Sequence, residues 1–116
     1  MRKIWHLSSC STCQRIIREL GGLQDFEQQD IKEQNISPEE LDWLRTKTGS
    51  YEALFSRRAL KFREWGLHEQ TLTEKDYRDL ILKEYTFLKR PVIAVDGEVF
   101  AGNAKPVVEA AKSKLG

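Results

Sequence analysis

The sequence lacks the features that mark several classes of protein. It has only two cysteines and no long hydrophobic run in its 116 residues. No stretch approaches a membrane span, and the N-terminus is too short in apolar length for a secretory signal. Internal repeats, low-complexity segments and linkers rich in proline, glycine or serine are also missing. Since this length suits one globular domain, we expect a single cytoplasmic domain over residues 1–116.

The chain has no excess of charge of either sign. It carries 19 basic and 18 acidic side chains, and 40% of its residues are hydrophobic. This balance is typical of an ordinary globular surface without a net field. It does not indicate nucleic acid, an anionic membrane or a polyanionic substrate as a partner. We therefore expect no direct contact with nucleic acid or membrane.

The N-terminal segment predicts a strand, a short loop and a helix. Residues 3–7 form an apolar run of the length of a buried strand. From Ser11 the apolar residues recur at helical spacing, until Gly21-Gly22 ends the helix. A polar and weaker signal predicts a second strand over residues 26–31.

Capping signals indicate three helical segments in the middle of the chain. The clearest begins at Ser37, which is followed by a proline at the first helical position and a glutamate at the third. Ser50 is expected to cap a further helical stretch that runs to Gly66. Thr73 opens a third helix with one apolar face. We therefore expect a helical insertion over about residues 37–88.

The C-terminal segment predicts a hairpin and a final helix. Pro91 can begin a strand, and residues 92–95 follow as an apolar run. Asp96-Gly97 is a two-residue turn of the type I′ class, so residues 98–101 return as the antiparallel partner. Gly102-Asn103 is expected to end the hairpin and cap the last helix. The order β-α-β, inserted helices, then β-β-α predicts an α/β mixed sheet with the thioredoxin-like fold.

The two cysteines stand together as Cys10-Ser11-Thr12-Cys13, at the joint between the first strand and the first helix. Free N–H groups and the positive end of the helix dipole stabilise a thiolate at such a position. We therefore expect Cys10 to be the nucleophile and Cys13, one turn later, to be the resolving thiol. So tight a loop gives a structural disulfide little stabilising effect. An inert pair of cysteines at a helix start is the alternative.

A zinc site is the competing interpretation of the same residues. His6 with the two cysteines supplies three possible ligands, whereas a closed structural site needs four. No second pair of cysteines or histidines follows, and His68 is isolated in a polar segment. We therefore expect no metal ion and interpret His6 as a structural histidine of the first strand whose hydrogen bonds are satisfied.

Four arginines could either bind an anion or lie on a solvated surface. Arg90 stands immediately before Pro91 and is expected to face the loop that holds Cys10. A guanidinium there would lower the thiol pKa or bind an oxyanion through two parallel hydrogen bonds. Arg57 and Arg63 fit a solvated helix surface, and Arg58 lies beside them.

Together these motifs resemble the arsenate reductase/Spx family. The resemblance rests on the cysteine motif, on Ser56-Arg57-Arg58, on residues 89–97 and on Phe100-Ala101-Gly102, and it covers nearly the whole chain. It implies a thioredoxin-like core with an inserted helical subdomain, a cis peptide bond before Pro91, and Cys10 as the nucleophile.

The resemblance also implies a set of site residues. Arg58 and Arg90 match two arginines that glutaredoxin-linked arsenate reductases use on the oxyanion. Arg58 is matched by its spacing to Phe62, and its neighbour Arg57 is the alternative. The residues expected to contact substrate around the thiol are Ser9, Ser11, Thr12 and Pro91. No resident cofactor is implied, because an external thiol such as glutathione with glutaredoxin, or thioredoxin, supplies the electrons.

Two departures from those arsenate reductases bear on function. Their third arginine falls near Phe100-Ala101-Gly102, where this chain has none, which predicts weak arsenate reduction. Those enzymes also lack a second cysteine in the motif, whereas the Spx-type regulators that bind the RNA polymerase α subunit have both. We therefore expect an arsenate-reductase-like thiol–disulfide oxidoreductase, with a redox-sensing transcription regulator as the alternative.

Overall fold

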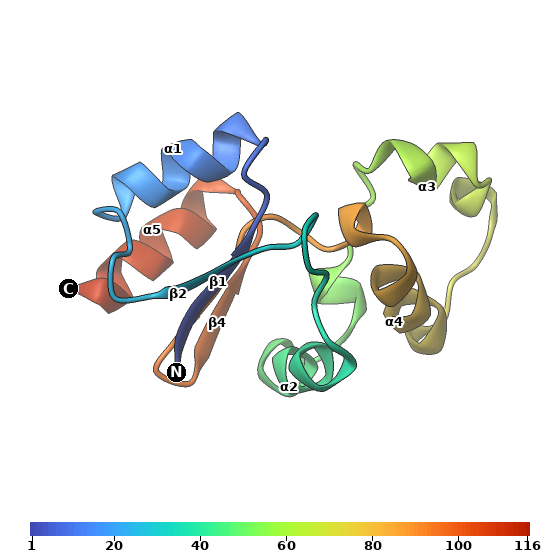
Figure 1. Ribbon diagram of the computed structural model, residues 1–116. Coiled ribbons are helices and arrows are strands. Elements are labelled where there is room, and N and C mark those ends of the chain that lie inside the picture. The colour runs from blue at the N-terminus through green and yellow to red at the C-terminus, as the bar shows by residue number, and fades with distance from the viewer. The chain divides into compact units, whose positions relative to one another are not determined.

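The computed structural model describes all residues from Met1 to Gly116, as two compact units. The first comprises Met1–Gln34 and Arg90–Gly116, and the second comprises Asn35–Lys89. Figure 1 shows the elements of each. None of the helices has the length and apolar character needed to span a membrane.

The first unit is built on a mixed sheet of four strands in the order β2-β1-β3-β4. β1 pairs with β2 in parallel and with β3 antiparallel, and β3 pairs with β4 antiparallel. This confirms the expected α/β class and the β-α-β and β-β-α order. The elements of the unit are β1 (Arg2–His6), α1 (Ser11–Glu19), β2 (Glu27–Asp30), β3 (Val92–Val95), β4 (Glu98–Ala101) and α5 (Lys105–Leu115).

One apolar core joins α1 and α5 to the sheet, and Figure 1 shows both helices next to the strands. Burial of each such aliphatic side chain stabilises the fold by roughly 1.5–3 kcal/mol. The packing therefore fixes α1 against the sheet. The buried members of the core are Ile4, Ile16, Ile17, Leu20, Leu23, Phe26, Ile93, Val95, Val108 and Ala111.

The C-terminal hairpin has the predicted turn. Asp96 and Gly97 both adopt positive φ, of 49° and 92°, as a type I′ turn requires. The peptide bond before Pro91 is cis, which confirms that expectation. The expected cap at Asn103 is wrong, because α5 begins at Lys105 with the extended Ala104 at its N-cap and a proline in its first turn. A proline needs no capping acceptor for its missing N–H.

The second unit consists of three α-helices and three short 3-10 turns. Two of the helices begin with a capping box, formed by Ser37 with Glu40 and by Thr73 with Asp76. Both helix starts were predicted from these residues. The elements are α2 (Pro38–Thr48), η1 (Glu52–Leu54), α3 (Leu60–Glu64), η2 (Leu67–Glu69), α4 (Glu74–Lys83) and η3 (Tyr85–Phe87).

The predicted continuous helical stretch from Ser50 to Gly66 is wrong, because the chain breaks between η1 and α3. Phe55 forms an isolated antiparallel bridge with Leu88. The Ser56 N–H donates to the Phe87 carbonyl at 2.7 Å, and the Lys89 N–H donates to the Leu54 carbonyl at 2.9 Å. These long-range backbone bonds replace the local bonds that a helix would have made.

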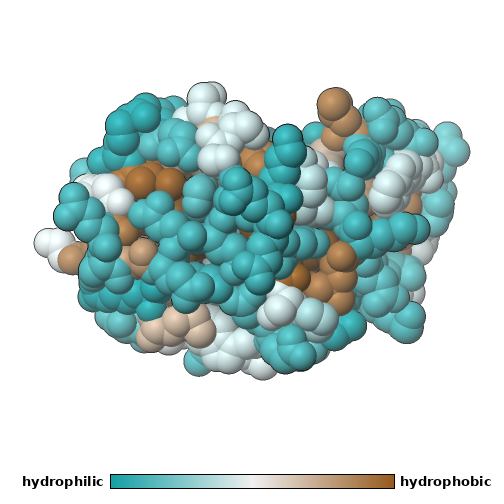
Figure 2. Space-filling model, viewed as in Figure 1, coloured by the Kyte–Doolittle hydropathy of each residue, from teal (hydrophilic) through white to brown (hydrophobic).

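Most of the surface seen in Figure 2 is hydrophilic, as the composition predicts. Three large hydrophobic side chains remain exposed, at 61% for Met1, 83% for Leu60 and 38% for Trp65. Isolated apolar side chains of this kind are normal on a globular surface. Trp65 also packs edge-on against Phe87, with ring centroids 5.4 Å apart.

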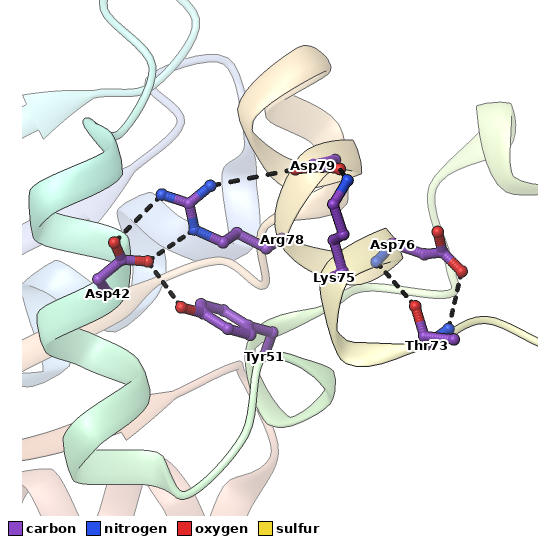
Figure 3. Close-up of polar contacts among 7 residues, drawn as sticks. All are labelled: Asp42, Tyr51, Thr73, Lys75, Asp76, Arg78 and Asp79. Carbon is purple, nitrogen blue, oxygen red and sulfur yellow. Dashed lines mark hydrogen bonds and ion pairs between the residues drawn. The ribbon is translucent and has the colours of Figure 1, made fainter.

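A polar cluster ties α2 to α4 within the second unit (Figure 3). Arg78 donates to both carboxylate oxygens of Asp42, at 2.8 Å and 3.1 Å, and the Tyr51 hydroxyl donates to the same carboxylate at 2.7 Å. The Arg78 hydrogen bonds, then the Tyr51 hydrogen bond, lower the pKa of Asp42 to about 2. The three bonds therefore favour the ionised carboxylate in the folded state.

This cluster predicts acid-dependent stability. Because the pKa of folded Asp42 lies below its ordinary value, the stabilisation is complete above about pH 4 and is lost as the pH falls towards 2. Asp42→Asn should lower the urea midpoint at pH 6, and the gap to the wild type should narrow between pH 4 and pH 2. Tyr51→Phe, which removes one of the three bonds, should show a smaller effect. A gap that is constant over this range would contradict the assignment.

Candidate active site

Cys10 stands at the N-cap of α1, at the end of the loop that follows β1. Its N–H donates to the Leu7 carbonyl at 3.0 Å, and its carbonyl accepts from the Gln14 N–H at 3.2 Å. These two bonds place the residue at the mouth of the helix. The thiol is half-buried, and neither cysteine forms a disulfide.

The surroundings of Cys10 favour its thiolate. Partial burial raises the pKa of the Cys10 thiol, but the N–H and side chain of Cys13, the Thr12 N–H and the charge of Arg90 lower it. The lowering influences together outweigh the burial, so the pKa lies below the ordinary thiol value. The Cys10 side chain closes no direct capping hydrogen bond, so these main-chain N–H groups act on a sulfur that is still free to react.

Cys13 differs from Cys10 in both its burial and its acidity. Its side chain is fully buried, at 0% exposure. Burial and the neighbouring Cys10 raise its pKa to about 11, although the Leu7 N–H and the Arg90 charge lower it slightly. One turn of helix therefore carries a half-buried thiol of lowered pKa and a buried thiol of raised pKa.

Arg90 supplies the positive charge that both thiols experience. It precedes the cis bond to Pro91, whose carbonyl accepts from the Gly102 N–H at 2.9 Å. The guanidinium is half-buried and forms no ion pair. Its charge is therefore available to an anion or a thiolate.

The loop before Cys10 is held by a residue that the sequence did not indicate. The Ser8 hydroxyl donates to the Asp30 carboxylate, which also accepts from the Lys32 N–H at 3.0 Å. The Ser8 hydrogen bond is the main reason that the pKa of Asp30 is lowered. Since β1 and β2 are parallel with His6 opposite Asp30, the loop after β1 must pass this carboxylate. Only the register of β1 against β2 could have indicated that Asp30 holds this loop.

His6 is buried as expected, at 8% exposure, but it is not satisfied. Its Nδ1 atom is buried without a hydrogen-bond partner, so the interpretation of a fully bonded structural histidine is wrong. No group of three or more His, Cys, Asp or Glu side chains is arranged to hold a metal ion.

The residues expected to contact substrate lie around Cys10 in different environments. Ser9 and Ser11 are exposed, Thr12 is half-buried, and Pro91 is buried. Ser11 and Thr12 help to line an open hollow of about 250 Å³ on α1, and its other lining residues are Arg15 and Arg18.

Arg58 and Arg57 belong to the second unit, where their surroundings differ. The Arg57 guanidinium donates to Glu52 at 2.6 Å and to the Tyr77 hydroxyl at 2.7 Å. Arg58 is exposed and makes no ion pair. Of the two neighbours, Arg58 therefore has the guanidinium that is free to bind an anion.

Comparison with known proteins gives a family and a fold. The ArsC family model matches residues 5–111. Comparison with curated proteins gave no match.

Three solved structures are similar over nearly the whole chain. The YffB protein has 20% identity and a TM-score of 0.81, with 100% of both chains covered. An ArsC-family-related protein from Bacteroides fragilis has 22% identity and a TM-score of 0.80, with 94% of this chain and 95% of that chain covered. The arsenate reductase from Vibrio cholerae has 21% identity and a TM-score of 0.72, with 96% and 95% covered. At these identities the likeness shows the fold alone, which is thioredoxin-like.

The two thiols should differ sharply in alkylation. With a pKa of about 11, roughly one Cys13 side chain in three thousand is ionised at pH 7.5. Limiting iodoacetamide should therefore label Cys10 first, as located by mass spectrometry of peptides. In a Cys13→Ser background, Arg90→Gln should move the midpoint of the Cys10 rate–pH profile upward, because a nearby cation is lost. Preferential labelling of Cys13 would reverse the assignment.

Proposed function

Because the chain belongs to the ArsC family, we propose that it is an arsenate-reductase-like thiol–disulfide oxidoreductase with Cys10 as nucleophile and Cys13 as resolving thiol. One observation carries the proposal: the motif sets a half-buried thiol of lowered pKa one turn before a buried thiol of raised pKa. A thiolate is the attacking species in exchange, and a resolving thiol is best kept protonated until the adduct forms.

The proposed exchange has two steps. The Cys10 thiolate attacks one sulfur of an oxidised partner RSSR, so that Cys10–S–S–R forms and RS⁻ leaves. Cys13 then loses its proton and attacks the Cys10 sulfur, which forms the Cys10–Cys13 disulfide and releases the second RS⁻. The protein loses two electrons and the partner gains them. An external thiol reverses the cycle, and no resident cofactor takes part.

Arg90 and Arg58 are proposed to bind negative charge during the reaction. For Arg90 the support is that its charge lowers the pKa of both thiols. For Arg58 the support is its free guanidinium and its match to the family motif. In an oxyanion reaction, Cys10 would bond to arsenic with loss of water. Cys13 would then attack the Cys10 sulfur, and the electron pair of the broken S–As bond would reduce arsenic(V) to arsenic(III).

A redox-sensing regulator is the second candidate, because the chain has the second cysteine of the Spx-type motif. There the same pair would act as a switch. Oxidation of Cys13 would require its buried sulfur to move towards Cys10, and this would change the surface around the first turn of α1. The proposed partner of that surface is the RNA polymerase α subunit.

Trapping a mixed disulfide tests the proposed roles. Cys13→Ser should accumulate one partner molecule bound to Cys10 after treatment with hydroxyethyl disulfide, whereas the wild type should proceed to the internal disulfide. Cys10→Ser should bind none, because Cys13 is buried and protonated. Intact-mass spectrometry distinguishes the three species. Equal trapping by Cys10→Ser would contradict the assignment of the nucleophile.

Arsenate reduction should be slow or absent in a glutaredoxin-coupled assay. A missing oxyanion contact typically costs about 3 kcal/mol, or roughly a hundredfold in rate. Any residual turnover should fall in Arg58→Lys and Arg90→Lys, which keep the charge but lose the planar fork. Arg63→Lys is the matched control and should have no effect. Efficient turnover by the wild type would show that another group replaces the third arginine, and pull-down of RNA polymerase without any thiol exchange would favour the regulator.

A further inference from the structure

The loop between β1 and α1 is one tight turn that contacts both cysteines. The Cys10 N–H donates to the Leu7 carbonyl at 3.0 Å, which closes the turn over Ser8 and Ser9. Cys10 forms one end of the turn, and Leu7 at the other end donates its N–H to the Cys13 sulfur. The position of this turn therefore affects both thiols.

Ser8 attaches the turn to β2, which lies beside β1 (Figure 1). The Ser8 hydroxyl donates to one carboxylate oxygen of Asp30, and the other oxygen accepts from the Lys32 N–H at 3.0 Å. The Ser8 hydroxyl, the Lys32 N–H and the Ser8 N–H lower the pKa of Asp30, so the carboxylate is ionised and accepts from all three. The residue after Asp30 is fixed to β1, because the Ile31 N–H donates to the His6 carbonyl at 2.9 Å. Asp30 thus ties the turn to the sheet.

The two cysteines depend on the turn to different extents. The main-chain N–H groups that stabilise the Cys10 thiolate belong to Cys13 and Thr12, in the first turn of α1. Core packing holds that helix in place. The main-chain N–H that lowers the pKa of Cys13 belongs to Leu7, outside the helix. Because a hydrogen bond weakens steeply as its geometry worsens, Cys13 loses its donor when the turn moves, whereas Cys10 keeps both of its own.

We propose that Asp30 is a positioning residue that sets the rate at which Cys13 resolves the adduct on Cys10. It acts through Ser8, which holds the Leu7 N–H against the Cys13 sulfur. This inference rests on the proposed function and adds control of its second step. In that step the Cys13 sulfur bonds to the Cys10 sulfur, the Cys10–S–S–R bond breaks, and R leaves as the thiol RSH with the proton that Cys13 gave up. Negative charge develops on the Cys13 sulfur as it attacks, and the Leu7 N–H stabilises that charge.

One experiment separates the two steps. The reduced protein is mixed with excess hydroxyethyl disulfide at neutral pH, quenched with acid at intervals and analysed by intact-mass spectrometry. Loss of the reduced protein gives the second-order rate of attack by Cys10. Conversion of the adduct into the internal disulfide gives the first-order rate of resolution by Cys13, which is independent of the reagent concentration.

Asp30→Ala should slow resolution about tenfold, the typical effect of losing a hydrogen bond to a charged group, and should leave the rate of attack within about twofold. Ser8→Ala should slow resolution less, because the Ser8 N–H still reaches the carboxylate. The double variant should be no slower than Asp30→Ala, since the two side chains act as one unit. Ser8→Thr keeps the hydroxyl and should restore the wild-type rate. If Asp30→Ala fails to fold, Ser8→Ala and Ser8→Thr decide the question alone.

Ser113→Ala is the matched control, because it removes an exposed hydroxyl from α5 in the same unit. Both of its rates should equal those of the wild type. An unchanged rate of resolution in the Asp30 and Ser8 variants, or an equal fall in both rates, would overturn the positioning role while leaving thiol exchange intact. A wild type that forms no internal disulfide would overturn the proposed function and this inference together.

Discussion

The packing of Ile16, Ile17 and Leu20 against the sheet fixes α1, and the position of the reactive thiols depends on it. Because this apolar face is buried, the first turn of the helix cannot rotate, and its free N–H groups stay directed towards the end of the β1 loop. The same packing buries Cys13 on the inner face and leaves Cys10 at the rim. The difference in acidity between the thiols is thus a consequence of core packing.

Two hydrogen bonds outside α1 provide a second constraint on the site. Asp30 holds Ser8 in the loop before Cys10, and the hydrogen bond from Gly102 to Pro91 holds the segment that carries Arg90. The thiols are therefore fixed by three pieces of chain that are distant in sequence. Thiol–disulfide exchange requires the attacking Cys10 sulfur to line up with the disulfide bond of the partner. A site that is already fixed loses little conformational entropy when the partner binds.

Local signals in the sequence predicted the elements whose stabilising contacts are also local. The capping boxes at Ser37 and Thr73 and the turn at Asp96-Gly97 each depend on neighbouring residues, and all three are present. The break at Phe55 could not be predicted, because its backbone bonds go to a segment far along the chain. The support from Asp30 was missed for a similar reason, since it follows from strand register. Cys10 could be identified because its environment is created by the start of its own helix.

The acidity of Cys10 comes largely from main-chain N–H groups, and this has an evolutionary consequence. Every residue except proline supplies the same N–H, so substitutions at positions 12 and 13 leave much of that contribution in place. The contribution of Arg90 has no such protection, because it depends on the charge of one side chain. Across descendants of this chain, most of the acidity of Cys10 should be inherited with the backbone, whereas the contribution of Arg90 can be lost by a single substitution.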